Sequence, residues 1–199
     1  GKIAKTTNGG DTWTLQTSGV TNNLYSIKFA SAETGFIVGS SGTVLNTFDG
    51  GANWTKQTPL TSATLFGVDA GSYDFSLKRA WAVGSNGVIL KFATMGGWVF
   101  QNSNTTNLLQ DVFIKPGSNS AEAWVVANGV SANGGPGFLK TTDVGQTWSV
   151  VSQDVSATGA MSSVKMFSNC IGMATLSTGK TLKTINGGTT WSLDYSSGS

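Results

Sequence analysis

The 199-residue chain has no histidine, one cysteine (Cys170) and only two glutamates, Glu33 and Glu122. Without histidine, the usual zinc sites and the serine–histidine–aspartate triad lack their common ligand or base. One cysteine excludes a disulfide within the chain, and we expect Cys170 to be a small core residue. The sequence therefore predicts no catalytic residue, no cofactor and no metal site, and it favours a protein that is not an enzyme.

Charge is also scarce. Asp, Glu, Lys and Arg make up 11% of the chain and the net charge is +2, which is under half the usual charged share. No basic run marks a nucleic-acid partner, and no apolar run approaches the roughly 18 residues of a membrane span. The abundant residues are Gly, Thr, Ser and Asn, a composition commoner in secreted β proteins. We therefore expect an extracellular or cell-surface location.

What the chain does contain is a recurring eight-residue motif. Four well-kept copies occupy residues 6–13, 47–54, 141–148 and 184–191, and a worn copy occupies 92–98. The tryptophans that end the five copies are 41, 44, 50 and 43 residues apart. A period in the forties with a turn motif in each copy is typical of a propeller-like repeat array.

The residue types of the motif predict a hairpin turn. Asp or Asn at the third position can bond the backbone two residues on, and the following glycines supply positive φ. The final Trp buries an apolar face beside the turn. We predict that these residues are structural: Asn8, Gly10, Trp13, Asp49, Gly51, Trp54, Asp143, Gly145, Trp148, Asn186, Gly188 and Trp191. The alternative, catalytic or metal-binding carboxylates, is disfavoured because two copies carry Asn, which cannot act as a general base.

Each full repeat is predicted to contain four strands, A to D from the innermost to the outermost. In the second repeat they span residues 24–29, 35–39, 42–46 and 54–57, whereas the first 16 residues contain only strands C and D. In the third repeat, residues 71–78 read as a long link between strands A and B. The B and C strands carry consecutive apolar residues, so both faces of each sheet must be covered. No window has the period of an amphipathic helix.

The predicted fold is an all-β propeller of four-stranded antiparallel blades, with four complete repeats and a half-blade at the N-terminus. We expect residues 1–195 to form a single propeller domain or propeller segment, with repeats ending near residues 16, 57, 101, 151 and 195, and residues 196–199 to form a tail. Counted this way, the chain has eighteen strands. A half-blade leaves a strand edge and an apolar face open. We expect this apolar surface near Ile3 and the strand at residues 13–16.

Lysines recur at the end of strand C, as Lys5, Lys91, Lys140 and Lys183. They could form a ring of cations that attracts an acidic partner. The favoured alternative is that they are solvated strand ends beside a turn.

The repeated pattern Gly-x-Val/Ile-Leu-Lys-Thr-x-Asp/Asn-Gly-Gly-x-Thr-Trp resembles that of the Asp-box (BNR) propellers, and most of all that of the photosystem II stability/assembly factor family. The resemblance implies a closed propeller that docks other proteins without catalysing a reaction. Plastid and cyanobacterial members are described as using an arginine-rich patch, and a single arginine, Arg79, argues against that role here. Sialidases share the motif but use an arginine triad, which one arginine cannot supply.

Three functions remain open, in decreasing order of preference. The first is a non-enzymatic protein-interaction or assembly module that binds through the loops at one end. The partners would be other proteins, with further copies of the chain completing the half-blade as one alternative. The second is a lectin-like, carbohydrate-binding propeller, with Phe36, Trp81, Trp124 and Tyr73 as candidate stacking residues and the loop 128–136 as a further candidate contact. The third is a glycosidase, for which Asp69 and Asp111 would have to lie about 5 to 9.5 Å apart.

Overall fold

The chain folds as an all-β protein, which confirms the predicted fold class. The computed structural model describes residues 1–72, 78–93, 97–115, 122–129, 137–151 and 158–194. Within these ranges there are eighteen strands and one short 3₁₀ turn, η1 (Ser85–Gly87). None of the described residues belongs to a helix with the length and hydropathy required to cross a membrane.

The strands form five antiparallel sheets, which we call blades 1 to 5. Blade 1 has two strands, β1 (Ile3–Lys5) and β2 (Thr14–Gln16). Blade 2 consists of β3 (Leu24–Phe29), β4 (Gly35–Gly39), β5 (Val44–Thr47) and β6 (Thr55–Lys56). Blade 3 consists of β7 (Leu65–Ser72), β8 (Lys78–Gly84), β9 (Ile89–Ala93) and β10 (Gly97–Gln101).

The last two blades repeat this pattern. Blade 4 consists of β11 (Leu109–Ile114), β12 (Ala123–Ala127), β13 (Gly137–Thr141) and β14 (Ser149–Val151). Blade 5 consists of β15 (Met161–Met166), β16 (Gly172–Leu176), β17 (Thr181–Thr184) and β18 (Ser192–Leu193). In every complete blade the four strands pair in chain order and correspond to the predicted strands A to D.

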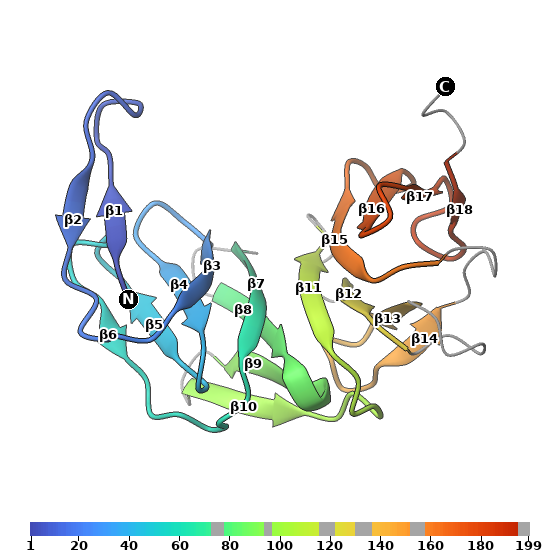
Figure 1. Cartoon of the computed structure of the whole chain (residues 1–199), viewed down its shortest axis with the longest axis horizontal. Helices are drawn as coiled ribbons and strands as arrows, with labels where there is room; N and C mark the ends of the chain where they lie inside the picture. Colours follow the sequence, from blue (N-terminus) through green and yellow to red (C-terminus); the bar gives the residue numbers. More distant parts are fainter. Residues whose placement is uncertain (73–77, 94–96, 116–121, 130–136, 152–157, 195–199) are drawn as a thin grey trace.

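The blades follow one another along an open arc (Figure 1). Strand A of each complete blade, which is β3, β7, β11 or β15, lies on the inner side of this arc. Blade 1 stands at one end and blade 5 at the other. Because β1 and β2 correspond to strands C and D, no described residue supplies strands A and B of blade 1.

The core lies between neighbouring blades. At the junction of blades 2 and 3 the buried side chains include Phe36, Val38, Leu65 and Val68. Similar clusters join blades 3 and 4 and blades 4 and 5. At the junction of blades 1 and 2 the buried cluster is reduced to Ile3, Ile37 and Leu45. Covering both faces of a blade explains why strands B and C carry apolar residues in succession.

Two sequence-based predictions are wrong in detail. The predicted link 71–78 is too long at both ends, because β7 and β8 remain paired as far as Ser72 and Lys78; residues 73–77 lie outside the described ranges. Cys170 is exposed and is not a core residue, because it lies in the turn between β15 and β16. Ile3 itself is buried, but apolar surface is exposed near it, as predicted, because the exposed Ile27 borders the same hollow as Ile3.

Several other predictions fall on residues outside the described ranges. They concern the worn turn at 94–96, Tyr73, most of the 128–136 loop and the tail at 196–199.

Candidate interaction surface

The four well-kept motifs fold into the same hydrogen-bonded turn. Thr at the first position donates from Oγ1 to Oδ1 of the third-position Asp or Asn, over 2.8–3.0 Å. The same hydroxyl accepts a hydrogen bond from the N–H of the fifth-position glycine. The fourth and fifth residues have positive φ in each copy, and in blade 4 the fourth residue is Val144, at φ 63°.

The side chain at the third position of the motif bonds the residue four positions further along the chain. The sequence predicted a bond to the backbone two positions further along. Oδ1 of Asp143 accepts the N–H of Thr147 at 2.9 Å, and Oδ2 accepts the Thr147 hydroxyl at 2.6 Å. Hydrogen bonds from Thr147 hold the pKa of Asp143 at about 2. Bonds from Asn53, the backbone N–H first, hold the pKa of Asp49 at about 2.

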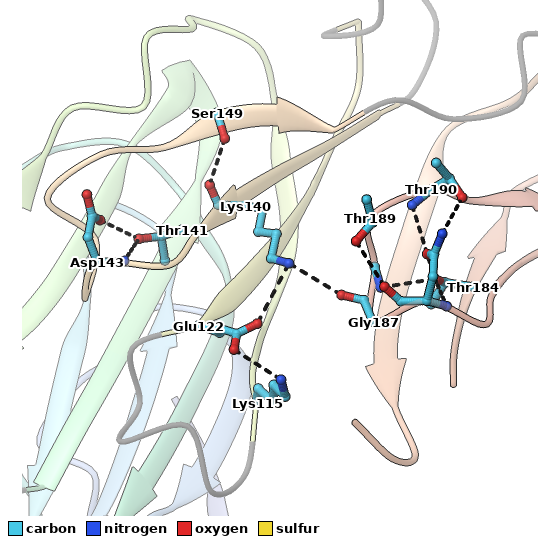
Figure 2. Close-up of polar contacts among 12 residues, drawn as sticks. Lys115, Glu122, Lys140, Thr141, Asp143, Ser149, Thr184, Gly187, Thr189 and Thr190 are labelled. Atoms are coloured by element: carbon cyan, nitrogen blue, oxygen red, sulfur yellow. Dashed lines mark hydrogen bonds and ion pairs between the residues drawn. The ribbon is translucent and has the colours of Figure 1, made fainter. Parts of the chain in front are cut away.

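The Asn copies close the same turn without a carboxylate. Oδ1 of Asn186 accepts the N–H of Thr190 at 3.0 Å, and its Nδ2 donates to the Thr190 hydroxyl at 2.8 Å (Figure 2 draws these bonds). Asn8 bonds Thr12 in the same way. In all four turns the third-position side chain is therefore engaged by its own turn.

The tryptophan that ends a motif packs toward the preceding blade. Trp98, Trp148 and Trp191 are all buried. Each shares its cluster with the aromatic residue of strand B in the preceding blade, namely Phe36, Trp81 and Trp124, respectively. The ring centroids of Trp98 and Phe36 are 5.5 Å apart.

The first two motif tryptophans lack such a partner. Trp54 is half-buried, and its Nε1 has no hydrogen-bond partner within the described part of the chain. Trp13 is 63% exposed, so the prediction that every motif tryptophan is buried is wrong for this copy. The reason is topological, because each tryptophan depends on strand B of the blade before its own.

The strand C lysines connect neighbouring blades. Each donates from Nζ to a carbonyl in the turn of the next blade: Lys5 to Gly50 at 2.8 Å, Lys91 to Val144 at 2.8 Å and Lys140 to Gly187 at 3.3 Å. These three lysines are therefore not the solvated strand ends that the sequence favoured, whereas Lys183 of blade 5 is exposed. Burial lowers the pKa of Lys91.

Lys140 shows the full environment of this inter-blade contact (Figure 2). Its ammonium lies 4.8 Å from the ring centroid of Trp124 and 3.7 Å from the Glu122 carboxylate. Glu122 in turn pairs with Lys115 at 3.0 Å. The glutamate is thus part of a contact between strands and turns.

Asp69 and Asp111, the carboxylates considered for glycoside hydrolysis, lie on strands A of blades 3 and 4. Asp69 is buried, pairs with Lys28 at 2.7 Å and accepts the N–H of Ile114 in blade 4 at 2.7 Å. Asp111 accepts the hydroxyl of Ser163 in blade 5 at 2.8 Å, and burial raises its pKa. Both carboxylates join adjacent blades. The described residues include no group of three or more His, Cys, Asp or Glu side chains arranged to hold a metal ion.

The face of blade 2 that points toward blade 1 is only partly covered, because the buried cluster of Ile3, Ile37 and Leu45 leaves part of strand A exposed. Ile27, at the fourth position of strand A, is 52% exposed, whereas the equivalent Val68, Val112 and Val164 are at most 5% exposed. Phe29, two residues on, is 37% exposed, whereas its equivalents in the later blades are buried. We call the surface formed by Leu24, Tyr25, Ile27, Phe29, Trp54 and the unpaired edge of β1 the open face.

Two adjoining hollows lie on the open face. One, of about 140 Å³, is bordered by β1, Gln16, Ile27, Phe29, Gly50, Gly51 and Trp54. The other, of about 220 Å³, is bordered by Lys2, Ile3, Ala4, Leu24, Tyr25, Ser26, Ile27 and Ile37. They share Ile3, Ala4 and Ile27, so together they form one groove along β1.

Comparison with known families identifies the repeat. Residues 4–109, just over half of the chain, match the model of the photosynthesis system II assembly factor YCF48. The chain belongs to this family. The suspected relationship to the Asp-box assembly-factor propellers is thereby confirmed. No curated protein matches the chain.

Solved structures share the propeller fold of this YCF48-family chain. YCF48 bound to a D1 peptide is 19% identical, with a TM-score of 0.66 over 90% of this chain and 55% of that one. YCF48 from Cyanidioschyzon merolae is 19% identical, with a TM-score of 0.66 over 98% and 64%. The GH74 enzyme of Niastella koreensis is 22% identical, with a TM-score of 0.68 over 95% and 34%. The chain thus spans less than two thirds of either YCF48 chain.

The open face of this family member was only partly foreseeable. The half-blade count predicted exposed apolar surface near Ile3 and at residues 13–16. Leu15 in the second region is exposed, and the exposed Ile27 borders the same hollows as Ile3. The sequence did not indicate that the exposed side chains near Ile3 belong to strand A of blade 2. The sequence of this strand has the same apolar positions as β7 and β11, so only the missing preceding strands could have marked it as exposed.

Proposed function

We propose that the chain is a non-enzymatic protein-interaction module that binds a segment of a partner protein during the assembly of a larger complex. The observation that carries this proposal is membership of an assembly-factor family. The related YCF48 bound to a D1 peptide adds that a propeller of this kind can hold a peptide.

A glycosidase is the less favoured alternative. The GH74 enzymes share the fold at 22% identity or less. Against it, the oxygens of Asp69 and Asp111 are already engaged by neighbouring blades. The raised pKa of Asp111 suits a general acid, but burial, together with the nearby charge of Asp69, accounts for it. We expect no sugar release from xyloglucan above that of the Asp111→Asn variant.

Carbohydrate binding is the other alternative. Three of its four candidate stacking residues, Phe36, Trp81 and Trp124, are fully buried between blades. A side chain packed on both faces cannot stack on a sugar ring. The fourth candidate, Tyr73, lies outside the described residues.

Binding to a peptide array and to a glycan array distinguishes the protein-interaction function from carbohydrate binding. The full chain, fluorescently labelled, is applied to an array of peptides from diverse proteins and to a glycan array. The proposal predicts reproducible binding to a subset of peptides and none to glycans. Binding to glycans alone would replace the proposed function with the lectin.

Two further properties complete the proposal. An extracellular or cell-surface location follows from composition only, and fractionation of cells producing the full-length gene product would test it.

Association between copies through blade 1 is the alternative to a foreign partner. Light scattering over a range of concentrations would detect such association as a mass that rises with concentration.

A further inference from the structure

We propose that the outer edge of blade 3 is an interface between two copies of the chain, in which β10 of one copy pairs antiparallel with β10 of the other. This inference goes beyond the proposed function and does not depend on it. It also does not involve the ends of the array, because blade 3 lies between two complete blades (Figure 1).

Among the described strands at the outer edge of a blade, β10 is the longest. It pairs with β9 over five residues, from Gly97 to Gln101, with no shift in register. The equivalent strands of the other blades pair over only two or three residues. The second edge of β10 pairs with no described strand, and it lies on the convex side of the arc (Figure 1). A row of unpaired main-chain N–H and C=O groups is therefore presented there.

The side chains of β10 do not protect this edge. Val99 is 42% exposed and Phe100 is 55% exposed. Proteins usually guard an exposed edge with a charge, a proline or a bulge. β10 has none of these, whereas the shorter β6 carries the exposed Lys56. The position of Val99 is occupied by Thr or Ser in the outermost strands of the other blades, namely by Thr14, Thr55, Ser149 and Ser192.

Both neighbouring blades hold β10 in place. Trp98 is buried in the cluster that joins blade 3 to blade 2. The side chain of Gln101 accepts the indole N–H of Trp81 at 2.9 Å, and that of Trp148 in blade 4 at 3.4 Å. Because both junctions fix the strand, its free edge already has the extended conformation that pairing requires, and little ordering remains to oppose association.

A second copy of the chain offers a strand that fits this edge. An antiparallel pair of identical strands is related by a twofold axis, so each copy donates and accepts the same hydrogen bonds. With the axis at Val99, the midpoint of β10, Trp98 of each copy lies opposite Phe100 of the other. Aromatic cross-strand pairs of this kind stabilise a sheet. Since β10 carries no charge, the pairing brings no like charges together.

The twofold arrangement also closes. Pairing of β10 with a different outer edge would leave a β10 unused on one copy, so further copies could add without limit. Pairing of β10 with β10 uses the same edge in both copies and stops at a dimer. The contact is small because it consists of five residues from each copy, so we expect a weak dimer whose fraction rises with concentration.

The first test is sedimentation equilibrium of the full chain over a wide range of concentrations. Wild type should show a monomer–dimer equilibrium. Val99→Lys should raise the dissociation constant of the dimer at least about tenfold, because it places like charges opposite one another. Val99→Thr, the type of residue found in other blades, should raise it less. Ser149→Lys, the matched change at the equivalent position of blade 4, should leave it unchanged.

The second test is disulfide cross-linking in a Cys170→Ser background, which removes the exposed cysteine of the chain. Val99→Cys would place two thiols opposite one another across the axis. Opposed Cα atoms of antiparallel strands are about 4.5–5.5 Å apart, which is within the reach of a disulfide. Mild oxidation should therefore convert Val99→Cys to a covalent dimer, whereas Ser149→Cys should remain monomeric.

Circular dichroism of each variant confirms that it is folded. A mass that stays monomeric at every concentration would overturn the inference and leave the proposed function standing, since the peptide array tests that function separately. Self-association that Val99→Lys leaves unchanged would also overturn it and would assign the contact to another surface, such as blade 1. Array peptides whose binding Val99→Lys abolishes, without any dimer, would assign the edge to the strand of a foreign partner instead.

Discussion

The junction of blades 3 and 4 and the junction of blades 1 and 2 are built from the same repeat, but only the first is filled. In the filled junction Trp148 is buried against Trp81, with ring centroids 6.4 Å apart. In the open junction Trp54 borders a hollow and is only half-buried; its aromatic neighbour is Phe29 of its own blade, at 6.0 Å, and it packs at the edge of the small cluster of Ile3, Ile37 and Leu45. The turns beside both tryptophans make the same hydrogen bonds.

The difference separates two roles of the motif. The turn is local, because Thr, Asp or Asn, and Gly satisfy one another within eight residues. The tryptophan is not local, because it is buried only when the preceding blade has a strand B. Stability in a repeat array divides in this way between the repeats and their interfaces.

The largest expected difference concerns the tryptophans themselves. Trp148→Ala should lower the free energy of unfolding by about 3–5 kcal/mol, the usual cost of removing a buried tryptophan. Trp54→Ala should cost only about 1–2 kcal/mol, because much of its ring has no neighbour to lose. Urea denaturation of the two variants and wild type measures both values.

Trp13→Ala is the control, because this tryptophan is exposed and its loss should change stability by no more than about 0.5 kcal/mol. Equal costs at Trp148 and Trp54 would mean that the open junction is packed as tightly as the filled one.

A smaller effect is expected for the lysines that cross a junction. Lys140→Ala should cost about 1–2 kcal/mol, because it removes a charged hydrogen bond to Gly187 and a cation–π contact with Trp124. Lys183→Ala, at the equivalent position of blade 5, is exposed and should cost no more than about 0.5 kcal/mol. Thermal unfolding of both variants tests this, and similar shifts for the two would refute a role in joining blades.

The smallest effect concerns the loss of stability in acid. We expect it to be the same for the turn at the open junction and the turn at the filled junction. The pKa values of Asp49 and Asp143 are held at about 2, below their ordinary value of 3.8. Each therefore stabilises the fold above pH 3.8 and loses this contribution as the pH falls from 3.8 through 2. Asp49→Asn and Asp143→Asn should each reduce the loss of stability between pH 4 and pH 2, and by similar amounts.

Urea midpoints measured across this pH range provide the comparison. A steeper loss in either Asn variant than in wild type would show that the carboxylate has another role.

The fold was predictable because the residues of each motif determine their own turn. The period of the tryptophans and the apolar runs in strands B and C were enough for the number of strands and their blades. The prediction for Cys170 failed because a free cysteine is usually buried, whereas this one lies in the exposed turn between β15 and β16.

The open face was less predictable, because burial of a strand depends on a different blade. Ile27 and Val68 occupy equivalent positions with similar side chains, yet one is half exposed and the other buried. The prediction that the strand C lysines are solvated failed for the same reason, since the carbonyls that Lys5, Lys91 and Lys140 bind lie about 45–53 residues further along the chain. Contacts between repeats depend on how the blades are arranged, so no single motif predicts them.

The account's central claim is that the turn of each motif is local, whereas the burial of its tryptophan depends on strand B of the preceding blade. The most direct measurement is hydrogen exchange at the indole N–H groups of the full chain, followed by NMR. We expect slow exchange at Trp98, Trp148 and Trp191, which are buried, and fast exchange at Trp13, which is 63% exposed. Equal protection at all four tryptophans would contradict the account.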